Sequence, residues 1–478
     1  MSKSSGTFKD VLKVAFSNFC IVISGGFVGF IIPKVLGVSG YGYYKTFTLY
    51  ASYVGIFSFG ISEGLYLKYS GCDYESLNLS KMRFFSKFFF SLQLCIGLTI
   101  VLLSLCFLKN EARFIFIAVA VYLVEMNFTA YLQYIAQMTM KFNYYSIRNV
   151  IKSILTIVAV MIILCSYYFD KEQDQRYEYF TILVIIISTI LLIIYIEKFK
   201  NIIFGKIDGI QVYKKELINT LTSGFPYLLS LMCSTLLFSI DRQFVAIAFD
   251  IKTYGIYAFA YSMLSLVTVC TSAISTVIYP KLKKNTAELV FQNYPLLSAY
   301  VSSLVILALN IYFPLIWFIN TFLPQYKDSL EIFRIIFPGL ALSSCVNVVM
   351  QNYYKYLNKN TYFFVINLFV LILSIFTNAI ALFIFNNPQA ISWASIFVLI
   401  VYYFISEHYF IHNHLIKWKK NALYLLISMF LFYICTCFTN NFFHFFIYFL
   451  SSCVVTILFN KTSILNSFRT LLRSFSHT

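Results

Sequence analysis

Long apolar runs separated by short polar connectors dominate this chain of 478 residues. Most runs reach about 20 residues, the length at which a helix crosses the apolar core of a membrane. The pattern predicts about 14 spanning helices. We place them at residues 11–36, 42–67, 84–108, 113–138, 148–169, 178–197, 219–247, 254–279, 294–322, 329–353, 361–386, 389–411, 421–439 and 441–460. The expected fold is therefore an all-α integral membrane protein.

The connectors divide the predicted helices into two six-helix lobes and a final pair. We expect an N-terminal lobe at residues 1–200, a cytoplasmic linker at 201–218, a C-terminal lobe at 219–415, and a last helix pair with a cytoplasmic tail at 416–478. Because each lobe holds an even number of spans, both lobes begin on the same side of the membrane. They should then be related by a pseudo-two-fold axis along the membrane normal.

One segment occurs twice. Residues 41–68 and 254–281 align without gaps, and each copy begins with a tyrosine and a glycine, Tyr41-Gly42 and Tyr254-Gly255. Two similar halves in one membrane chain are typical of transporters whose halves rock around a central site. The copies differ in charge. Lys45 aligns with Ala258, and Glu63 aligns with Thr276.

Composition supports the membrane assignment. Apolar residues make up 60% of the chain and charged residues 12%, whereas soluble domains carry roughly 25% charged residues. Mean hydropathy is +0.78. The spans leave no room for a folded domain outside the membrane, and the first apolar run is too long for a secretory leader, so we expect it to remain as a helix.

The net charge of +17 does not indicate a nucleic-acid partner, because the basic residues punctuate the apolar runs and form no single patch. Most of the 36 lysines and arginines, Lys141, Arg148 and Lys152 among them, fall in connectors or at span ends on the cytoplasmic side of the predicted topology. This bias places both termini in the cytoplasm. The cysteines show no metal-ligand spacing, and the chain has no phosphate-binding glycine-rich loop. We therefore expect no cofactor other than a coupling H⁺ or Na⁺.

Charged residues inside spans are costly and usually face a polar cavity. In the second span, Lys45, Ser52 and Glu63 are separated by nearly whole numbers of helical turns, so a continuous helix would carry them on one face. Such a stripe suits a cavity wall. The alternative is that both charges lie at the membrane interfaces, where a lysine can extend to water.

The seventh span carries a second polar face. Its members are Tyr227, Ser230, Ser234 and Asp241. The adjacent Arg242 could bind a phosphate, since a guanidinium matches phosphate geometry. The alternative is a structural ion pair between helices.

Two further spans carry polar ridges in otherwise apolar helices. They are Glu125, Thr129, Gln133 and Gln137 in span 113–138, and Asn347 and Gln351 in span 329–353. Amides could bind sugar hydroxyls, or they could join helices by hydrogen bonds. Arg334 lies near the outer end of span 329–353. Glu407 lies near the inner end of span 389–411, where we expect it at the membrane interface.

Three stretches resemble polysaccharide flippases of the Wzx type. Residues 33–37 (Pro-Lys-Val-Leu-Gly) with 41–44 (Tyr-Gly-Tyr-Tyr) look like the exit of their first helix. Residues 239–242 (Ser-Ile-Asp-Arg), ahead of 254–257 (Tyr-Gly-Ile-Tyr), look like the start of their second half. Residues 322–326 (Phe-Leu-Pro-Gln-Tyr) with 332–335 (Ile-Phe-Arg-Ile) resemble their connector between spans nine and ten. Together these signals favour the polysaccharide branch of the MOP (multidrug, oligosaccharidyl-lipid, polysaccharide) superfamily.

The resemblance implies a transporter, not an enzyme. It would flip an undecaprenyl-pyrophosphate-linked oligosaccharide from the cytoplasmic to the outer leaflet of a bacterial cell membrane, for O-antigen, capsule or exopolysaccharide assembly. A polymerase and a chain-length regulator of the same pathway would be its partners. On this hypothesis the pyrophosphate and sugar would meet Lys34, Lys45, Arg242, Arg334, Gln133, Asn347 and Gln351. The coupling ion would bind at Glu63, Asp241 or Glu125.

Two other function classes remain open. A MATE-like drug or cation antiporter belongs to the same superfamily, but such proteins usually stop at twelve spans. A membrane polysaccharide polymerase or glycosyltransferase usually needs a large external loop or catalytic carboxylates beside a soluble domain. The external connectors predicted here are short, which disfavours the enzyme.

Overall fold

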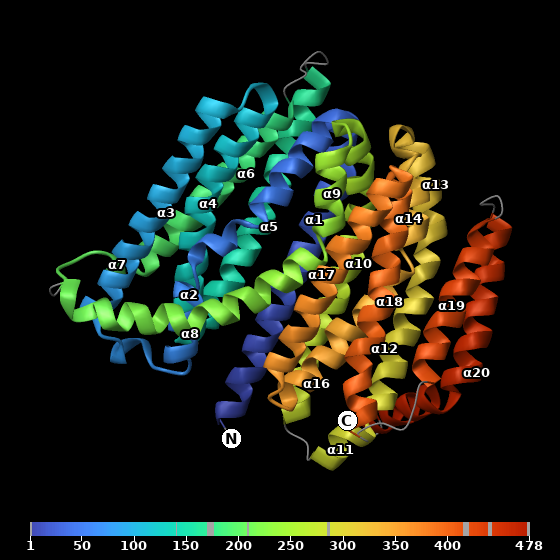
Figure 1. The fold of residues 1–478 in the computed structure, drawn as a ribbon. Coiled ribbons are helices and arrows are strands. Elements are labelled where there is room, and N and C mark those ends of the chain that lie inside the picture. Colours follow the sequence, from blue (N-terminus) through green and yellow to red (C-terminus); the bar gives the residue numbers. More distant parts are fainter. Residues whose placement is uncertain are drawn as a thin grey trace. The chain divides into compact units, whose positions relative to one another are not determined.

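The computed structural model describes residues 2–139, 141–169, 176–207, 210–283, 287–413, 420–437 and 442–475. Every regular element in these ranges is a helix (Figure 1), as the apolar pattern predicts. The chain forms two compact units, Met1–Gly255 and Ile256–Thr478. The lobe and linker boundaries expected from the connectors stay a prediction.

The first unit is built from long helices joined by short ones. They are α1 (Ser2–Ala51), η1 (Val54–Ser58), α2 (Ile61–Tyr69), η2 (Tyr74–Ser76), α3 (Leu79–Phe107), α4 (Asn110–Met138), α5 (Phe142–Phe169), α6 (Arg176–Lys198), α7 (Lys200–Ile203), α8 (Ile210–Leu237) and α9 (Ile240–Ala248). α10 (Ile251–Lys283) begins in this unit and continues into the second. α1 consists of two helices that meet at Gly37, whose φ of 68° suits a glycine. This is where the apolar pattern separates the first two spans.

The second unit follows with a similar set. Its elements are α11 (Ala287–Gln292), α12 (Tyr294–Ala308), η3 (Leu309–Ile311), α13 (Tyr312–Phe322), η4 (Pro324–Tyr326), α14 (Ser329–Ile336), α15 (Gly339–Ser344), the π-helix η5 (Cys345–Met350), α16 (Gln351–Tyr356), α17 (Asn360–Phe385), α18 (Pro388–His412), α19 (Lys420–Cys437) and α20 (Phe442–Phe475). The helix pair Ser329–Ile336 and Gly339–Tyr356 bends by 43°. Pro338 lies at the bend, where it cannot donate a helical hydrogen bond.

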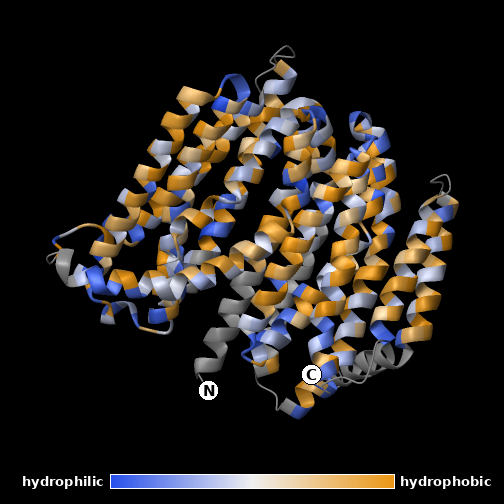
Figure 2. Cartoon of the chain, viewed as in Figure 1, coloured by the Kyte–Doolittle hydropathy of each residue, from blue (hydrophilic) through white to orange (hydrophobic). Residues whose placement is uncertain are grey.

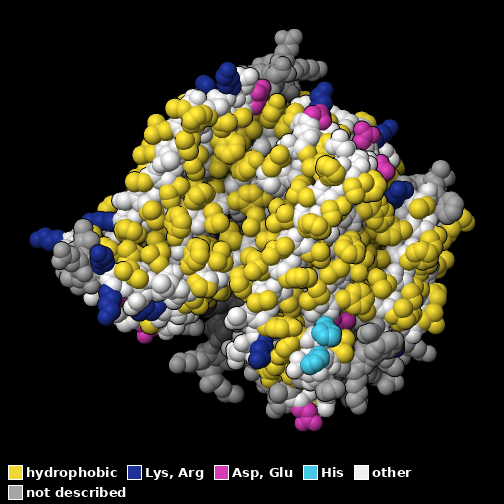
Figure 3. Space-filling model, in the orientation of Figure 1, with side chains coloured by type: hydrophobic (Ala, Val, Ile, Leu, Met, Phe, Trp, Pro, Cys, Tyr) yellow, Lys and Arg dark blue, Asp and Glu magenta, His cyan; other side chains and the backbone are white. Residues whose placement is uncertain are grey.

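Within the described residues, 11 helices are long and apolar enough to cross a membrane, or up to 12 if the bent pair is one span. In this count, Phe16–Ser58 is one span although α1 bends at Gly37. Helix α10 is not among the 11. The predicted count of about 14 therefore stays a prediction. Apolar residues run along most of the helices (Figure 2). On the face drawn in Figure 3, apolar side chains cover most of the surface and charged side chains lie towards the helix ends.

The second span is broken, which corrects the expectation of a continuous helix over residues 42–67. α1 ends at Ala51, and Phe59 and Gly60 adopt left-handed backbone between η1 and α2. Gly60 tolerates its φ of 82° because it lacks a Cβ. The second copy of the repeat has Ala273 at this position, and α10 runs through it without interruption. Non-helical backbone at membrane depth is tolerated only where protein or a water-filled cavity surrounds it.

The seventh span is also broken, between α8 and α9. Ser239 lies at the break; its hydroxyl donates to Thr235 O at 2.8 Å and accepts from the Tyr53 hydroxyl at 3.0 Å. Serine bonds of this kind bend helices. The helical spacing that placed Asp241 on one face with Tyr227 therefore does not hold across the break.

The two repeated glycines mark a close crossing of α1 and the start of α10. A Cβ added at Gly42 would lie 2.4 Å from Ile251 O, and one added at Gly255 would lie 2.4 Å from Val38 O. Val38 and Ile251 occupy equivalent places just before the two copies, so the contact is reciprocal, as in a two-fold interface. The Tyr-Gly motif is thus explained by packing.

Substitution at this crossing should destabilise the protein. We expect Gly42→Ala and Gly255→Ala each to cost about 1–3 kcal/mol, because the new methyl group meets backbone that cannot move aside cheaply. The melting temperature of the purified chain measures this effect. Gly25→Ala is the matched control, since a Cβ there meets nothing within 4 Å. Equal melting temperatures for all three variants would contradict the tight crossing.

Candidate functional site

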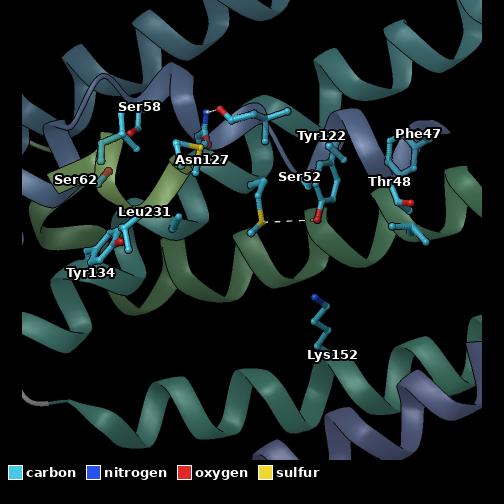
Figure 4. Close-up of a pocket in the computed structure, with 18 of the residues that line it drawn as sticks. Phe47, Thr48, Ser52, Ser58, Ser62, Tyr122, Asn127, Tyr134, Lys152 and Leu231 are labelled. Atoms are coloured by element: carbon cyan, nitrogen blue, oxygen red, sulfur yellow. Dashed lines mark hydrogen bonds between the residues drawn. The ribbon is translucent and has the colours of Figure 1, made fainter. Parts of the chain in front are cut away.

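The first unit contains a cavity of about 530 Å³ (Figure 4). Its walls come from α1, η1, α2, α4, α5, α6 and α8. The lining residues are Val28, Tyr44, Phe47, Thr48, Ala51, Ser52, Val54, Gly55, Ser58, Ser62, Glu63, Tyr122, Met126, Asn127, Ala130, Tyr134, Lys152, Thr156, Phe180, Val184, Leu228, Leu231 and Met232. The broken part of the second span thus borders an internal space, as its backbone requires.

Glu63 is the acidic residue of this cavity. It is 5% exposed and lies in the first turn of α2. The Ser58 hydroxyl donates to its Oε2 at 3.2 Å, and the Gly60 N–H donates to Ser58 Oγ at 3.3 Å. Among the described residues Glu63 takes part in no ion pair. Ser52 and Glu63 both line the cavity, as the sequence predicts, although they reach it from either side of the helix break and not along one helix face.

Lys152 of α5 is the basic residue of the cavity, and its side chain extends from its helix towards the cavity (Figure 4). The sequence did not single it out, because Lys152 lies near the inner end of the predicted span 148–169 and was counted with the cytoplasmic residues. In the structure it lies inside the candidate span Ser146–Phe169. No ion pair engages it within the described part of the chain. Arg148 and Thr156 lie one turn before and after it, so the three form one helix face. This i, i+4 spacing is the sequence feature that could have identified Lys152 as part of a polar helix face.

Amide side chains hold the broken backbone in place. Asn127 of α4 donates to Val54 O at 2.9 Å and to Gln93 Oε1 at 2.7 Å. Gln93 of α3 in turn donates to Phe57 O at 2.8 Å. These bonds replace part of the helical hydrogen bonding that the break removes. The cavity wall around Glu63 is therefore fixed by two neighbouring helices.

Three of the predicted cationic contacts lie in the first unit, outside the cavity lining. Lys34 is exposed, and Lys45 Nζ lies 5.2 Å from the centre of the Tyr41 ring. The Arg242 guanidinium donates to Phe238 O. The structure thus gives Lys45 and Arg242 partners within the protein, and their contact with phosphate stays a prediction.

The other predicted residues of the first unit lie on α4 and α9. Glu125 is mostly buried, and its Oε1 accepts from the Thr189 hydroxyl of α6 at 2.6 Å. Gln133 is partly buried. Asp241 is buried, and its Oδ1 accepts from the Arg242 N–H at 2.8 Å. None of these lines the cavity, and their roles in sugar or ion binding stay predictions.

In the second unit, the predicted residues lie on α14, η5 and α16. Arg334 Nη1 donates to Thr436 O at 3.5 Å. Asn347 belongs to the π-helix η5, and Gln351 begins α16 directly after it; both are partly buried. Irregular helix of this type occurs often at functional sites, which keeps both residues as candidates.

Glu407, expected at the membrane interface, is buried inside the protein. It is 3% exposed. The Tyr403 hydroxyl donates to its Oε1 at 3.0 Å, and Asn421 of α19 donates to Tyr403 at 3.3 Å and to Ser298 at 2.8 Å. The surrounding helices therefore bury Glu407 in a polar network, which its position near the end of a span could not reveal.

A second polar cluster fixes the start of α8. Glu216 accepts from Lys68 at 2.6 Å, from Lys81 at 2.9 Å and from the Tyr69 hydroxyl at 2.8 Å. Closer to the cavity, a Cβ at Gly224 would lie 1.9 Å from Gly60 O. α8 runs across the direction of α3 and α4 and lies against α2 (Figure 1). The part of α8 that lines the cavity is therefore held by the ion pairs of Glu216 and by the close contact of Gly224 with Gly60.

Removing the charge of Glu216 should loosen this attachment. Glu216→Gln is expected to cost about 1 kcal/mol, because partly exposed ion pairs contribute little individually. Glu197→Gln, at an exposed position of α6, serves as the matched control. A melting curve of each purified variant provides the comparison, and a Glu216→Gln protein as stable as the control would rule out a role for the cluster in holding α8.

Comparison with known proteins places the fold. No protein-family model matches the sequence, and no curated protein matches it. Among solved structures, the chain is similar to the lipid II flippase MurJ in an inward closed conformation, with a TM-score of 0.70 and 16% identity over 97% of this chain and 100% of that one. It is also similar to an inward-facing multidrug resistance MATE family transporter of the MOP superfamily, with a TM-score of 0.58 and 13% identity over 88% of this chain and 98% of that one. The chain therefore has the fold that MurJ shares with a transporter of the MOP superfamily.

Proposed function

We propose that this protein flips an undecaprenyl-pyrophosphate-linked oligosaccharide from the cytoplasmic to the outer leaflet of a bacterial cell membrane. The observation that carries the proposal is the cavity of the first unit, which presents the cation Lys152 within a candidate membrane span. Similarity to the fold of a lipid II flippase over nearly the whole chain supports it. The protein acts by alternating access and catalyses no covalent step.

The physical need is to carry a charged headgroup through hydrocarbon. An isolated phosphate cannot leave water without a compensating charge. Lys152 supplies that charge in a region where screening by water is weak, so its attraction for an anion is strong. Arg148, one turn away on α5, lies near enough to add to the positive potential of this wall. The headgroup would therefore bind against α5.

The other walls suit a sugar. Thr48, Ser52 and Asn127 line the cavity together with the ring of Tyr134. Hydroxyl, amide and aromatic groups of this kind fix the orientation of a polar ligand in a pocket. In the same proposal, Lys34, Lys45, Arg242 and Arg334 attract the pyrophosphate along its route, and Gln133, Asn347 and Gln351 contact the glycan. The coupling ion binds at Glu63, Glu125 or Asp241.

Three stretches of sequence favour the polysaccharide branch of the superfamily, and with it O-antigen, capsule or exopolysaccharide assembly. A polymerase and a chain-length regulator would then act on the flipped product. Both termini would lie in the cytoplasm, in accord with the distribution of lysine and arginine.

A MATE-like drug or cation antiporter is the second candidate. Glu63 favours it, because a cavity carboxylate outside any ion pair among the described residues suits a cationic ligand. The similarity to a MATE transporter agrees with this reading. Lys152 disfavours it, since a cation in the same cavity repels a cationic drug.

Deletion of the gene in its host tests the proposal. Lipid-linked oligosaccharide should then accumulate in the cytoplasmic leaflet, and the wild-type chain should restore its transfer. The measurement is the amount of this lipid that added glycosidase reaches in intact and in opened spheroplasts. Normal transfer in the deletion strain, with altered resistance to cationic drugs, would favour the antiporter and overturn the flippase.

A further inference from the structure

We propose that the break in the second span, from Ser58 to Glu63, is a binding site for a monovalent metal cation, Na⁺. The site opens into the cavity of the first unit. It deepens the proposed function, because it selects one of three candidate carboxylates for the coupling ion. Its existence can be tested without a lipid substrate.

Oxygen atoms gather at this break. Ser58, Ser62 and Glu63 lie close together along the chain, on the two sides of the break, and all three line the cavity. The Ser62 hydroxyl is fully buried at 0% exposure and has no hydrogen-bond partner within the described residues. A buried hydroxyl without a partner is costly, and a bound cation would satisfy it. Carboxylate and hydroxyl oxygens are the donors that hard cations prefer.

An ionised carboxylate at the break would need a counterion. Tyr134 of α4 and Tyr227 of α8 lie close enough to sense Glu63, and both are phenols that supply no positive charge. Lys152, the basic residue of the same cavity, lies beyond ion-pair distance of Glu63. A buried carboxylate in such surroundings is stabilised when a cation binds beside it.

The backbone around the break is rigid, as an ion site requires. Amides of Gln93 and Asn127 hold η1. On the α2 side, a Cβ at Gly64 would lie 2.2 Å from Thr220 O, so α2 packs directly on the backbone of α8. Interrupted helices with polar ends are where transporters bind Na⁺. A site held in this way is preorganised, so the backbone need not rearrange when the ion binds.

The repeat supplies an internal comparison. Its second copy has Thr276 where the first has Glu63, and Ala273 where the first has Gly60. α10 accordingly continues as a helix through this region. The carboxylate and the backbone break therefore occur together in one copy and are both missing from the other, as expected if they serve one site.

The melting temperature of the purified full-length chain tests the site, with NaCl compared with KCl and choline chloride at equal ionic strength and fixed pH. Ligand binding to the folded state raises stability. We expect Na⁺, but not K⁺ or choline, to raise the melting temperature of the wild type. Ser62→Ala should need at least tenfold more Na⁺ for the same rise, and Glu63→Gln should show none. Ser104→Ala, a buried serine of α3 that bonds to its own helix, should behave as the wild type.

Three results would overturn the proposal. One is a wild type that responds equally to the three salts. Another is a Na⁺ effect that survives unchanged in Ser62→Ala and Glu63→Gln. The third is a dependence on pH alone that Glu63→Gln abolishes, which would assign the break to a proton. If Glu63→Gln fails to fold, Ser62→Ala and Na⁺ titration of the wild type still decide. The melting experiment contains no lipid-linked glycan, so an absence of Na⁺ binding would not contradict the proposed flippase activity. Equally, an absence of flipping would not contradict Na⁺ binding.

Discussion

Replacing Lys152 with alanine is expected to reduce flipping of lipid-linked oligosaccharide by about 10–100-fold. A hydrogen bond to a charged group contributes about 1.5–3 kcal/mol, and about 1.4 kcal/mol corresponds to a factor of ten. Lys152 takes part in no ion pair among the described residues, so its charge is available to a ligand in the cavity. Lys152→Arg keeps the charge and should retain most of the activity.

Complementation of a deletion strain measures this effect, with surface polysaccharide as the readout and the protein level checked by immunoblot. Lys109→Ala is the matched control, because Lys109 is exposed just before α4 and does not line the cavity. If Lys152→Ala supports as much surface polysaccharide as Lys109→Ala at equal protein level, the cavity cation has no part in transport.

Replacing Gly224 with alanine is expected to have the largest effect on stability, at least about 3 kcal/mol, the upper end of ordinary overpacking. The new Cβ would lie 1.9 Å from Gly60 O and 2.5 Å from Gly64 N. Both atoms belong to backbone, which moves at greater cost than a side chain. α8 would have to separate from α2, and its cavity residues Leu228 and Leu231 would move with it.

Thermal unfolding of the purified chain measures this loss. The matched control is Gly26→Ala, in α1, where a Cβ meets nothing within 4 Å; it should keep or raise stability, since alanine favours helix over glycine. Equal melting temperatures for Gly224→Ala and Gly26→Ala would show that α8 and α2 are not in close contact.

Local sequence predicted the elements well because apolar runs of membrane length have few alternatives to a helix. The positions of the helices along the chain, the separation of the first two spans at Gly37, and the helical fold class all follow from this constraint. The repeat also identified two glycines that prove to matter. The contact between Gly42 and Gly255 could not be predicted, because the sequence of each copy does not show which distant segment it packs against.

The site was harder to predict than the elements. The helix break at Phe59 and Gly60 moved Glu63 off the face on which regular spacing placed it, and a single glycine in an apolar run does not distinguish a break from a continuous helix. Lys152 lies near the edge of a span, where hydropathy cannot separate a connector from a cavity wall. Glu407 also lies near the inner end of its span, yet neighbouring residues of α12 and α19 surround it with a polar network. In each case the neighbouring helices determine whether the side chain is buried, lines the cavity or is exposed. The hydropathy of a single helix carries no information about those neighbours.

If the chain moves a lipid-linked glycan across a membrane through the cavity of the first unit, the purified protein alone should carry out this transfer. The most direct test places the purified full-length protein in liposomes that contain undecaprenyl-pyrophosphate-linked oligosaccharide with a fluorescent label on the sugar. A membrane-impermeant quencher then reports the fraction of label in the outer leaflet over time. We expect wild-type protein to bring the protected label to the quencher, and Lys152→Ala to do so at least about 10-fold more slowly. Label that stays protected as in protein-free liposomes, or equal rates for the two proteins, would contradict it.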